Sequence, residues 1–185
     1  SFMIRTDIFA TPIWQGPITL NNNLLIKFFN KAKELNYLAK DKSSINGSEQ
    51  TEDLTISKEF ADTQRRIEHM YYQETGNKVR MGNAWICKNI KGSMNEMHVH
   101  GNTDISGVYY IETPKNCGGL VFRNPNDCVQ MNNRHFKKDT CWWGSYIIPA
   151  EKGKIVFFPA HLPHRTQINQ NEKPRLALSF NLRYI

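Results

Sequence analysis

Two segments in the first half of the chain carry apolar residues at helical spacing. From Asn23 to Lys40 the apolar residues recur every three or four positions and lysines take the other faces, which is typical of an amphipathic helix. A second segment begins at Ser57, a residue type that suits an N-cap, and ends at Gly76, with Phe60 and Ile67 on its apolar face. The pattern predicts two helices with their apolar faces in the core.

After Gly76 the pattern changes to short runs of β-branched and aromatic residues, separated by Gly, Pro and Asn turns. Earlier in the chain, Ile4 to Ile18 mixes such residues with prolines and predicts an edge strand and a turn. The other predicted strands are Val79 to Ile90, Ile105 to Glu112, Leu120 to Phe122, Ser145 to Ile148, Lys154 to Phe158 and Arg175 to Tyr184.

Helices followed by strands give an α+β order that is mainly β. About seven or eight short antiparallel strands would close into a two-sheet jelly roll, also called a double-stranded β-helix, with the two N-terminal helices packed on one sheet. In the final strand, Leu176, Leu178, Phe180 and Leu182 are expected to face the helices. The opposite, polar face, which begins with Arg175, would be solvent-exposed in an ordinary sandwich, whereas in a barrel-like jelly roll it can line an internal pocket.

Residues 41–55 are expected to be a loop because they hold few apolar residues to bury, and residues 125–143 are expected to be a second loop. For the first, a solvated connection is the simpler interpretation and a lid over a site is the alternative. No pattern in either stretch identifies a ligand, although loops of this kind commonly select the substrate.

At 185 residues the chain is expected to form one domain, residues 1–185, with a core that needs no disulfide. The four cysteines are irregularly spaced, and no apolar run approaches the roughly 18 residues of a membrane span. We therefore expect a soluble, cytoplasmic protein with reduced thiols and no membrane partner. The net charge of +7 suits an acidic partner, but Lys and Arg form no basic run, so nucleic-acid binding is allowed and not favoured.

The candidate chemistry lies just before the strand that starts at Ile105. His98 and His100 have a His-x-His spacing, which places both rings on the same side of an extended segment. Imidazole is the commonest metal ligand in proteins, and His164, after an aromatic strand that ends in Phe-Pro, is the expected third donor. Three such ligands suit iron, zinc, copper or nickel and leave positions open for catalysis.

Other interpretations of these residues stay open. His98 and His100 could be surface residues of a strand, with His164 in a turn. The carboxylate of Asp104, four residues after His100, could supply a metal ligand instead. His161 is expected behind the ligands or at the rim of a pocket, whereas His69 and His135 are expected to pack or to lie on the surface.

The order of several short motifs supplies more specificity than any one of them. These are Ile8 to Trp14, Asn83-Ala84-Trp85, His98-Val99-His100, Ser106 to Tyr110, Phe158-Pro159 with His164, and Arg175 to Asn181. Together they resemble the iron(II)- and 2-oxoglutarate-dependent dioxygenases of the prolyl-hydroxylase-like branch. More narrowly, they resemble a 2-oxoglutarate oxygenase family found in bacteria and phages.

The resemblance implies an enzyme that uses iron(II), 2-oxoglutarate and dioxygen to hydroxylate a substrate that the sequence does not identify. It implies His98, His100 and His164 as metal ligands, and Tyr110 and Arg175 as the groups that hold the far carboxylate of 2-oxoglutarate. An arginine suits this role because its planar guanidinium binds a carboxylate through two parallel hydrogen bonds and stays charged when buried. The alternative for Arg175 is a surface salt bridge.

His100 departs from the general oxygenase motif, which has Asp or Glu at that place. Either the site has three histidines, or Asp104 takes the carboxylate role, or the metal chemistry has changed; the His-x-His spacing favours His100 as the ligand. Two other functions stay open, namely a three-histidine metal enzyme without 2-oxoglutarate, similar to cupins or thiol dioxygenases, and a non-catalytic jelly-roll binding module. The positive charge weakly favours an anionic primary substrate.

Overall fold

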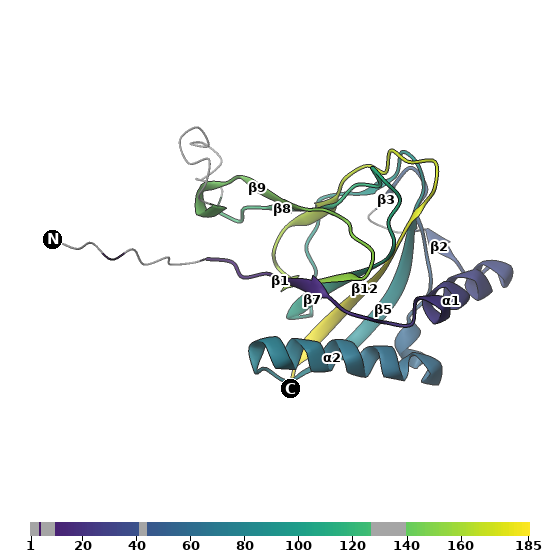
Figure 1. Cartoon of the computed structure of the whole chain (residues 1–185), viewed down its shortest axis with the longest axis horizontal. Coiled ribbons are helices and arrows are strands. Elements are labelled where there is room, and N and C mark those ends of the chain that lie inside the picture. The colour runs from purple at the N-terminus through teal and green to yellow at the C-terminus, as the bar shows by residue number, and fades with distance from the viewer. Residues whose placement is uncertain (1–3, 5–9, 41–43, 127–139) are drawn as a thin grey trace.

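A seven-stranded antiparallel sheet forms the body of the fold, and a smaller sheet lies across one of its faces (Figure 1). The computed structural model describes residues 4, 10–40, 44–126 and 140–185. In spatial order the large sheet contains β1 (Trp14–Pro17), β10 (Lys154–Pro159), β7 (Ile105–Glu112), β12 (Arg175–Tyr184), β5 (Val79–Asn89), β4 (Glu49–Gln50) and β2 (Ala39–Lys40). The smaller sheet contains β11 (His164–Thr166), β8 (Leu120–Arg123) and β9 (Ser145–Ile148), and β3 (Ser44–Ile45) pairs with β6 (Met94–Asn95).

Both predicted helices are present, but the first is shorter than predicted. Helix α1 (Asn22–Glu34) begins where the side chain of Asn21 accepts a hydrogen bond from the backbone N–H of Leu24. It ends because Asn36 adopts a left-handed backbone conformation, with φ of 55°, and Leu35 is half exposed. The predicted extension to Lys40 is therefore wrong, and Ala39 begins a strand instead.

The second helix, α2 (Ala61–Thr75), ends at Gly76 as predicted, since Gly76 has a φ of 72° and its N–H donates to the carbonyl of Tyr72. Two short 3₁₀ turns, η1 (Leu54–Ile56) and η2 (Lys58–Phe60), precede it, and η4 (Thr140–Trp142) lies between β8 and β9. Ser57 stands before η2 but its side chain makes no capping hydrogen bond. Neither helix of the described residues is both long and apolar enough to cross a membrane.

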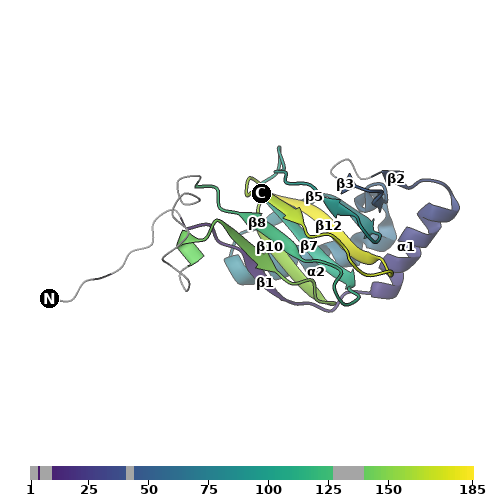
Figure 2. The ribbon, with the colours of Figure 1, turned by 90° about the horizontal axis from the view of Figure 1, so that it is seen from above.

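The helices bury the apolar face of the large sheet. Phe29 of α1 and Tyr71 of α2 belong to one buried cluster with the strands, and the Tyr71 ring lies 5.3 Å from that of Phe157 in β10. The same cluster contains the apolar side chains of β12, which are Leu176, Leu178, Phe180 and Leu182. The predicted orientation of the final strand is therefore confirmed, and Figure 2 shows β10, β7, β12 and β5 side by side in this sheet.

The opposite face of the large sheet is largely polar where β5, β12 and β7 meet. There Ser106 donates from its hydroxyl to Asn181 Oδ1 at 2.7 Å, and Asn181 Nδ2 donates to Asn83 Oδ1 at 2.9 Å. A second apolar cluster connects this face to the smaller sheet, through residues such as Phe158 of β10 and Phe122 of β8. The polar face thus lies between the two sheets.

The polar stretch 41–55 is more ordered than predicted in its described part. It contributes β3 and β4, the backbone N–H of Thr51 donates to the carbonyl of Ile86 in β5, and the Thr51 hydroxyl oxygen accepts a hydrogen bond from the backbone N–H of Ile86. Backbone and hydroxyl hydrogen bonds hold this segment in place, so its low apolar content did not predict these strands. Of the second predicted loop, residues 127–139, including His135, lie outside the described part of the chain.

Candidate metal centre

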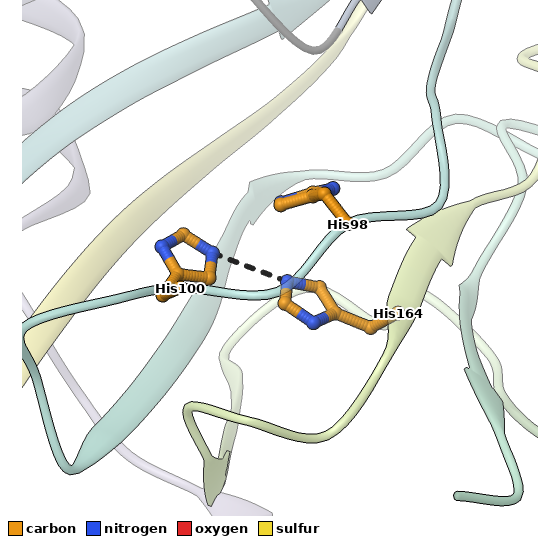
Figure 3. Close-up of side chains that lie close together, drawn as sticks. All are labelled: His98, His100 and His164. Carbon is orange, nitrogen blue, oxygen red and sulfur yellow. Dashed lines mark hydrogen bonds between the residues drawn. The ribbon is translucent and has the colours of Figure 1, made fainter.

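Three histidines from two distant parts of the sequence converge between the sheets. One ring nitrogen from each of His98, His100 and His164 lies within 4.8 Å of those from the other two. Figure 3 shows the rings of His100 and His164 pointing toward each other, with His98 beside them. The Nε2 atoms of His100 and His164 are 3.2 Å apart. Among the described residues, this is the one group of three or more potential metal-ligating side chains.

Backbone hydrogen bonds hold the two histidine segments together. The N–H of His98 donates to the carbonyl of His164 at 2.9 Å, and the N–H of His164 donates back at 3.0 Å. His100 is fixed separately, because its N–H donates to the carbonyl of Ala160 at 2.9 Å. The segment with His98 and His100 was predicted to be an extended strand, but it forms only an isolated β-bridge between His98 and His164. His164 begins β11 and does not lie in a turn.

Nearby carbonyl groups set the protonation of two of the rings. Nδ1 of His98 lies 2.7 Å from the carbonyl oxygen of Glu96, and Nδ1 of His164 lies 2.8 Å from that of Leu162. A carbonyl oxygen only accepts hydrogen bonds, so each Nδ1 must carry the proton. In the neutral rings, Nε2 then has a free lone pair, which is the arrangement found in metal-binding histidines.

Burial keeps the inner histidines neutral. It lowers the pKa of His100 to about 4, and the neighbouring His98 lowers it further in the same direction. Burial also lowers the pKa of His164 to about 3, against the opposing effect of its hydrogen bond to Leu162. Both side chains therefore offer lone pairs at neutral pH, which a metal ion requires.

The spacing of the nitrogens fits a shared metal ion. Two nitrogen ligands at about 2.1 Å from a metal, separated by 3.2 Å, subtend an angle of about 100° at the metal. That angle lies between the tetrahedral and octahedral values. An all-imidazole donor set suits iron, zinc, copper or nickel better than magnesium or calcium.

Asp104 does not lie with the histidines. Its side chain is exposed, and Oδ2 accepts a hydrogen bond at 2.9 Å from the backbone N–H of Tyr184, at the end of β12. His161 and His69 are also exposed and do not belong to the group. The structure thus brings together the three predicted histidines without the alternative carboxylate.

Aromatic rings lie beside two of the three histidines, His100 and His164. The Phe158 ring lies 4.6 Å from that of His164, centroid to centroid, and the Phe122 ring 6.4 Å from it. On the other side, the ring of Trp85 in β5 is 6.4 Å from that of His100. These side chains restrict the access of water to the site.

Arg175 is the most buried charged residue on the polar face, with 1% of its surface exposed. Its Nη1 donates to the carbonyls of Cys117 and Gly118, at 3.1 and 2.9 Å, and its Nη2 donates to Asn89 Oδ1 at 2.9 Å. No carboxylate of the described residues forms an ion pair with it, so the surface salt bridge considered for Arg175 is wrong. A buried charge without a counterion is costly, and a bound anion would lower that cost.

Sequence reasoning did not find the groups that position Arg175. Backbone carbonyls have no signature in the sequence, and Asn89 resembles any strand asparagine. The Gly118-Gly119 pair is the one hint, because a Cβ on Gly118 would lie 2.6 Å from the carbonyl oxygen of Gln167. Only glycine permits this close approach of the loop that holds the guanidinium.

Tyr110 lies beside Arg175 on the polar face, in register with Ala177 of β12. Burial raises the pKa of Tyr110 to about 12, although the nearby Arg175 charge acts in the opposite direction. The phenol therefore stays protonated and can donate a hydrogen bond. Among the described residues, its hydroxyl has no hydrogen-bond partner.

The register of the strands sets the distance between the two parts of the site. Trp85, beside His100, pairs with Ser179, and Asn89, which binds Arg175, pairs with Arg175 itself. Four residues of strand correspond to about 13 Å. The two parts of the site therefore lie at different positions along the same pair of strands.

Comparisons with known proteins agree with this geometry. A family model described as "Putative 2OG-Fe(II) oxygenase" matches residues 83–181, more than half of the 185-residue chain. The matched range contains all three histidines, Tyr110 and Arg175. A search of the curated proteins finds no match.

Several solved structures share the fold at low sequence identity. A prolyl-4-hydroxylase from Pseudomonas putida has a TM-score of 0.65 and 14% identity, over 94% of this chain and 93% of that one. A viral collagen prolyl hydroxylase from Paramecium bursaria Chlorella virus-1, in a 2OG complex, has a TM-score of 0.61 and 13% identity, over 92% and 96%. HygX from Streptomyces hygroscopicus, with nickel and 2-oxoglutarate bound, has a TM-score of 0.61 and 14% identity, over 93% of this chain and 82% of that one. These likenesses confirm the predicted jelly roll.

Proposed function

The chain belongs to the 2OG-Fe(II) oxygenase family, and from this premise we propose that it hydroxylates its substrate at an iron held by His98, His100 and His164. As a member of this family it is an oxidoreductase that depends on iron(II) and 2-oxoglutarate. The observation that carries the proposal is the convergence of three ring nitrogens within 4.8 Å of one another. We also propose that residues 1–185 act as one domain, because α1 and α2 share a core with the strands that carry the site.

The donor set fits iron(II). The histidines are neutral where burial lowers their pKa, and carbonyl groups orient two of the three rings with Nε2 free. With three neutral ligands, the full double charge of the metal remains in the site, whereas a carboxylate ligand would cancel one unit of it. This should strengthen the attraction of the site for an anionic co-substrate.

Arg175 and Tyr110 are the proposed binding groups for the far carboxylate of 2-oxoglutarate. The guanidinium is buried without a protein carboxylate, and the phenol beside it has a hydroxyl free to donate. A carboxylate between them would compensate the buried charge and accept hydrogen bonds from both. Asn89 and the carbonyls of Cys117 and Gly118 hold the guanidinium in place for this contact.

Bound iron(II) and 2-oxoglutarate supply the oxidising chemistry, in which dioxygen is consumed, 2-oxoglutarate loses carbon dioxide to become succinate, and the substrate gains a hydroxyl group. The residues of the chain bind and orient these components. Phe122 and Phe158 beside His164, and Trp85 beside His100, limit the contact of these two histidines with water, which would reduce side reactions of the oxidant with solvent.

Metal content after anaerobic loading and dialysis tests the proposed ligands. Elemental analysis should find one iron per chain in the unaltered protein and a large loss in His98→Ala, His100→Ala and His164→Ala. His161→Ala and His69→Ala are matched controls, since both remove an exposed imidazole outside the site, and they should retain the metal. Full retention of iron by all three ligand variants would refute the proposed site.

A further inference from the structure

Two arginines stand opposite each other near the end of β12. Arg183 of β12 and Arg80 of β5 are direct partners in the antiparallel pairing, and both are exposed. Figure 1 shows these two strands side by side, with the C-terminus at the end of β12. Directly opposite residues have Cβ atoms about 5 Å apart, so the two guanidinium groups can reach the same ligand.

Both arginines lie on the face of the sheet that carries the metal centre. Their neighbours Met81 and Leu182 are buried in the cluster against the helices, and the side chain of Tyr184 bonds to Tyr71 of α2. Because side chains alternate along a strand, Arg80 and Arg183 must point to the opposite face.

The arginine pair is the next row of side chains beyond Asn83 and Asn181, which pair with each other. Asn181 also pairs with Ser106, and Ser106 with Phe158, whose ring contacts His164. One row corresponds to two residues of strand, or about 7 Å. Along the strands, the arginines therefore lie one row beyond Phe158, with β7 between Arg183 and Phe158, and two rows beyond Trp85, which adjoins His100.

Along β12, Arg175 and the pair of Arg80 and Arg183 lie on opposite sides of the metal centre. Arg175 is four residues before Ser179, whose partner Trp85 adjoins His100, and Arg183 is four residues after it. Arg175 is buried, whereas Arg183 is exposed at the end of the strand. If Arg175 holds the co-substrate, the exposed pair remains available to the primary substrate.

Like charges directly opposite each other destabilise an antiparallel pair. No carboxylate of the described residues forms an ion pair with Arg80 or Arg183, although Asp104 Oδ2 accepts a hydrogen bond from the backbone N–H of Tyr184, the residue after Arg183. The arrangement therefore has a cost in stability and no evident structural gain. A ligand with negative charge would remove the repulsion and bind through charge-assisted hydrogen bonds.

We infer that Arg80 and Arg183 bind the anionic group of the primary substrate, and that this group is a doubly charged oxyanion of the phosphate monoester class. The two guanidinium groups match the charge of a dianion, and each can bind two of its oxygens. The inference rests on the proposed function, since it places the substrate's reacting carbon at the three histidines and its phosphate about two rows away.

Three small probes with the same ring test the charge class. Phenyl phosphate, benzenesulfonate and benzoate are titrated calorimetrically into the zinc-loaded protein in the presence of 2-oxoglutarate. We expect phenyl phosphate to bind most tightly, and Arg80→Gln/Arg183→Gln to weaken it by at least about tenfold, with each single variant between. Equal affinity for benzoate, or unchanged phosphate binding in the double variant, would overturn the inference.

A matched variant controls for the loss of net charge. Lys27→Gln/Arg65→Gln removes two positive charges from exposed positions on α1 and α2, and it should change phosphate binding less than about twofold. The thermal unfolding midpoint of Arg80→Gln/Arg183→Gln should equal or exceed that of the unaltered protein, because repulsion is relieved. A lowered midpoint would indicate a structural role and count against the inference.

Phosphorus-31 relaxation separates failure of this inference from failure of the proposed metal site. With cobalt(II) in place of zinc(II), the phosphorus of bound phenyl phosphate should relax faster, and His100→Ala should abolish the difference. If the arginine variants lose phosphate binding but cobalt has no effect, the metal site is wrong. If cobalt is retained by the histidines and the arginine variants still bind phosphate, the inference fails alone.

Discussion

At the scale of single residues, the site is defined by neutral and positive groups. His100 stands where the general oxygenase motif has a carboxylate, and Asp104, the nearby alternative, bonds instead to the backbone of Tyr184. The described part of the site thus contains no acidic ligand, and Arg175 adds a buried positive charge. At the proposed site, bound 2-oxoglutarate would balance this positive charge.

Replacing Tyr110 by Phe tests the second group proposed to hold 2-oxoglutarate. The change removes one hydroxyl that has no partner among the described residues, so the thermal midpoint should stay the same or rise. The dissociation constant for 2-oxoglutarate should increase by about three- to tenfold, which corresponds to about 0.5–1.5 kcal/mol for one hydrogen bond. Calorimetric titration of the metal-loaded protein measures both the loss and the stoichiometry. Unchanged affinity would remove Tyr110 from the site.

The sequence indicated the side chains of the proposed site more clearly than the groups that hold them in place. The His-x-His pair, the later histidine and the strand arginine could be recognised because each needs a specific side-chain type at a specific spacing. The carbonyls of Cys117 and Gly118 could not, since every residue has a carbonyl group. The position of Asp104 away from the histidines could not be predicted either, because its carboxylate binds the backbone N–H of Tyr184, which is distant in the sequence.

At the scale of elements, the seven strands of four or more residues and both helices formed in the predicted segments, whereas the shortest strands were not predicted. β2, β3, β4 and β6 have two residues each and β11 has three, which is too short for an alternation to show. They form because neighbouring strands offer hydrogen-bond partners. Helix α1 was predicted too long because periodicity continued past Asn36, where the backbone turns left-handed.

Gly107 in the middle of β7 marks a close contact that only glycine allows. A Cβ there would overlap the ring of Phe180 and lie 2.9 Å from the carbonyl oxygen of Val156. Gly107→Ala should therefore lower the free energy of unfolding by about 3 kcal/mol or more. Denaturant unfolding measures the change.

Gly101→Ala provides the matched control for Gly107→Ala. Gly101 directly follows His100, but a Cβ at this position meets nothing within 4 Å. Its substitution should change stability by less than about 0.5 kcal/mol and leave metal binding intact. Equal losses in the two variants would mean that the packing of β7 against Phe180 is not the cause.

At the scale of the whole molecule, the proposed metal would join parts of the chain that only the fold brings together. His98 and His100 follow β6, and His164 begins β11 in the smaller sheet. The helices pack on the opposite face of the large sheet and contribute no ligand. Because the unfolded chain cannot gather these three side chains, metal binding should stabilise the native state.

Nickel(II), which resists oxidation, serves to measure this stabilisation. At a free concentration about one hundred times its dissociation constant, it should add about 2.7 kcal/mol of stability. That corresponds to a rise of about 5–10 °C in the thermal midpoint of a chain of this size. His98→Ala should lose most of the shift and His161→Ala should keep it. A shift of the same size in His98→Ala would place the metal elsewhere.

The most direct test of the central claim is anaerobic titration of iron(II) and then 2-oxoglutarate, followed by visible spectroscopy. Chelation of the metal by the 2-oxo acid should give a weak charge-transfer band in the unaltered protein and in His161→Ala. The band should be absent in His100→Ala, and in Arg175→Lys it should need about tenfold more 2-oxoglutarate, because one compact ammonium group replaces the bidentate guanidinium. Iron binding without any band would contradict the account, and so would an undiminished band in His100→Ala.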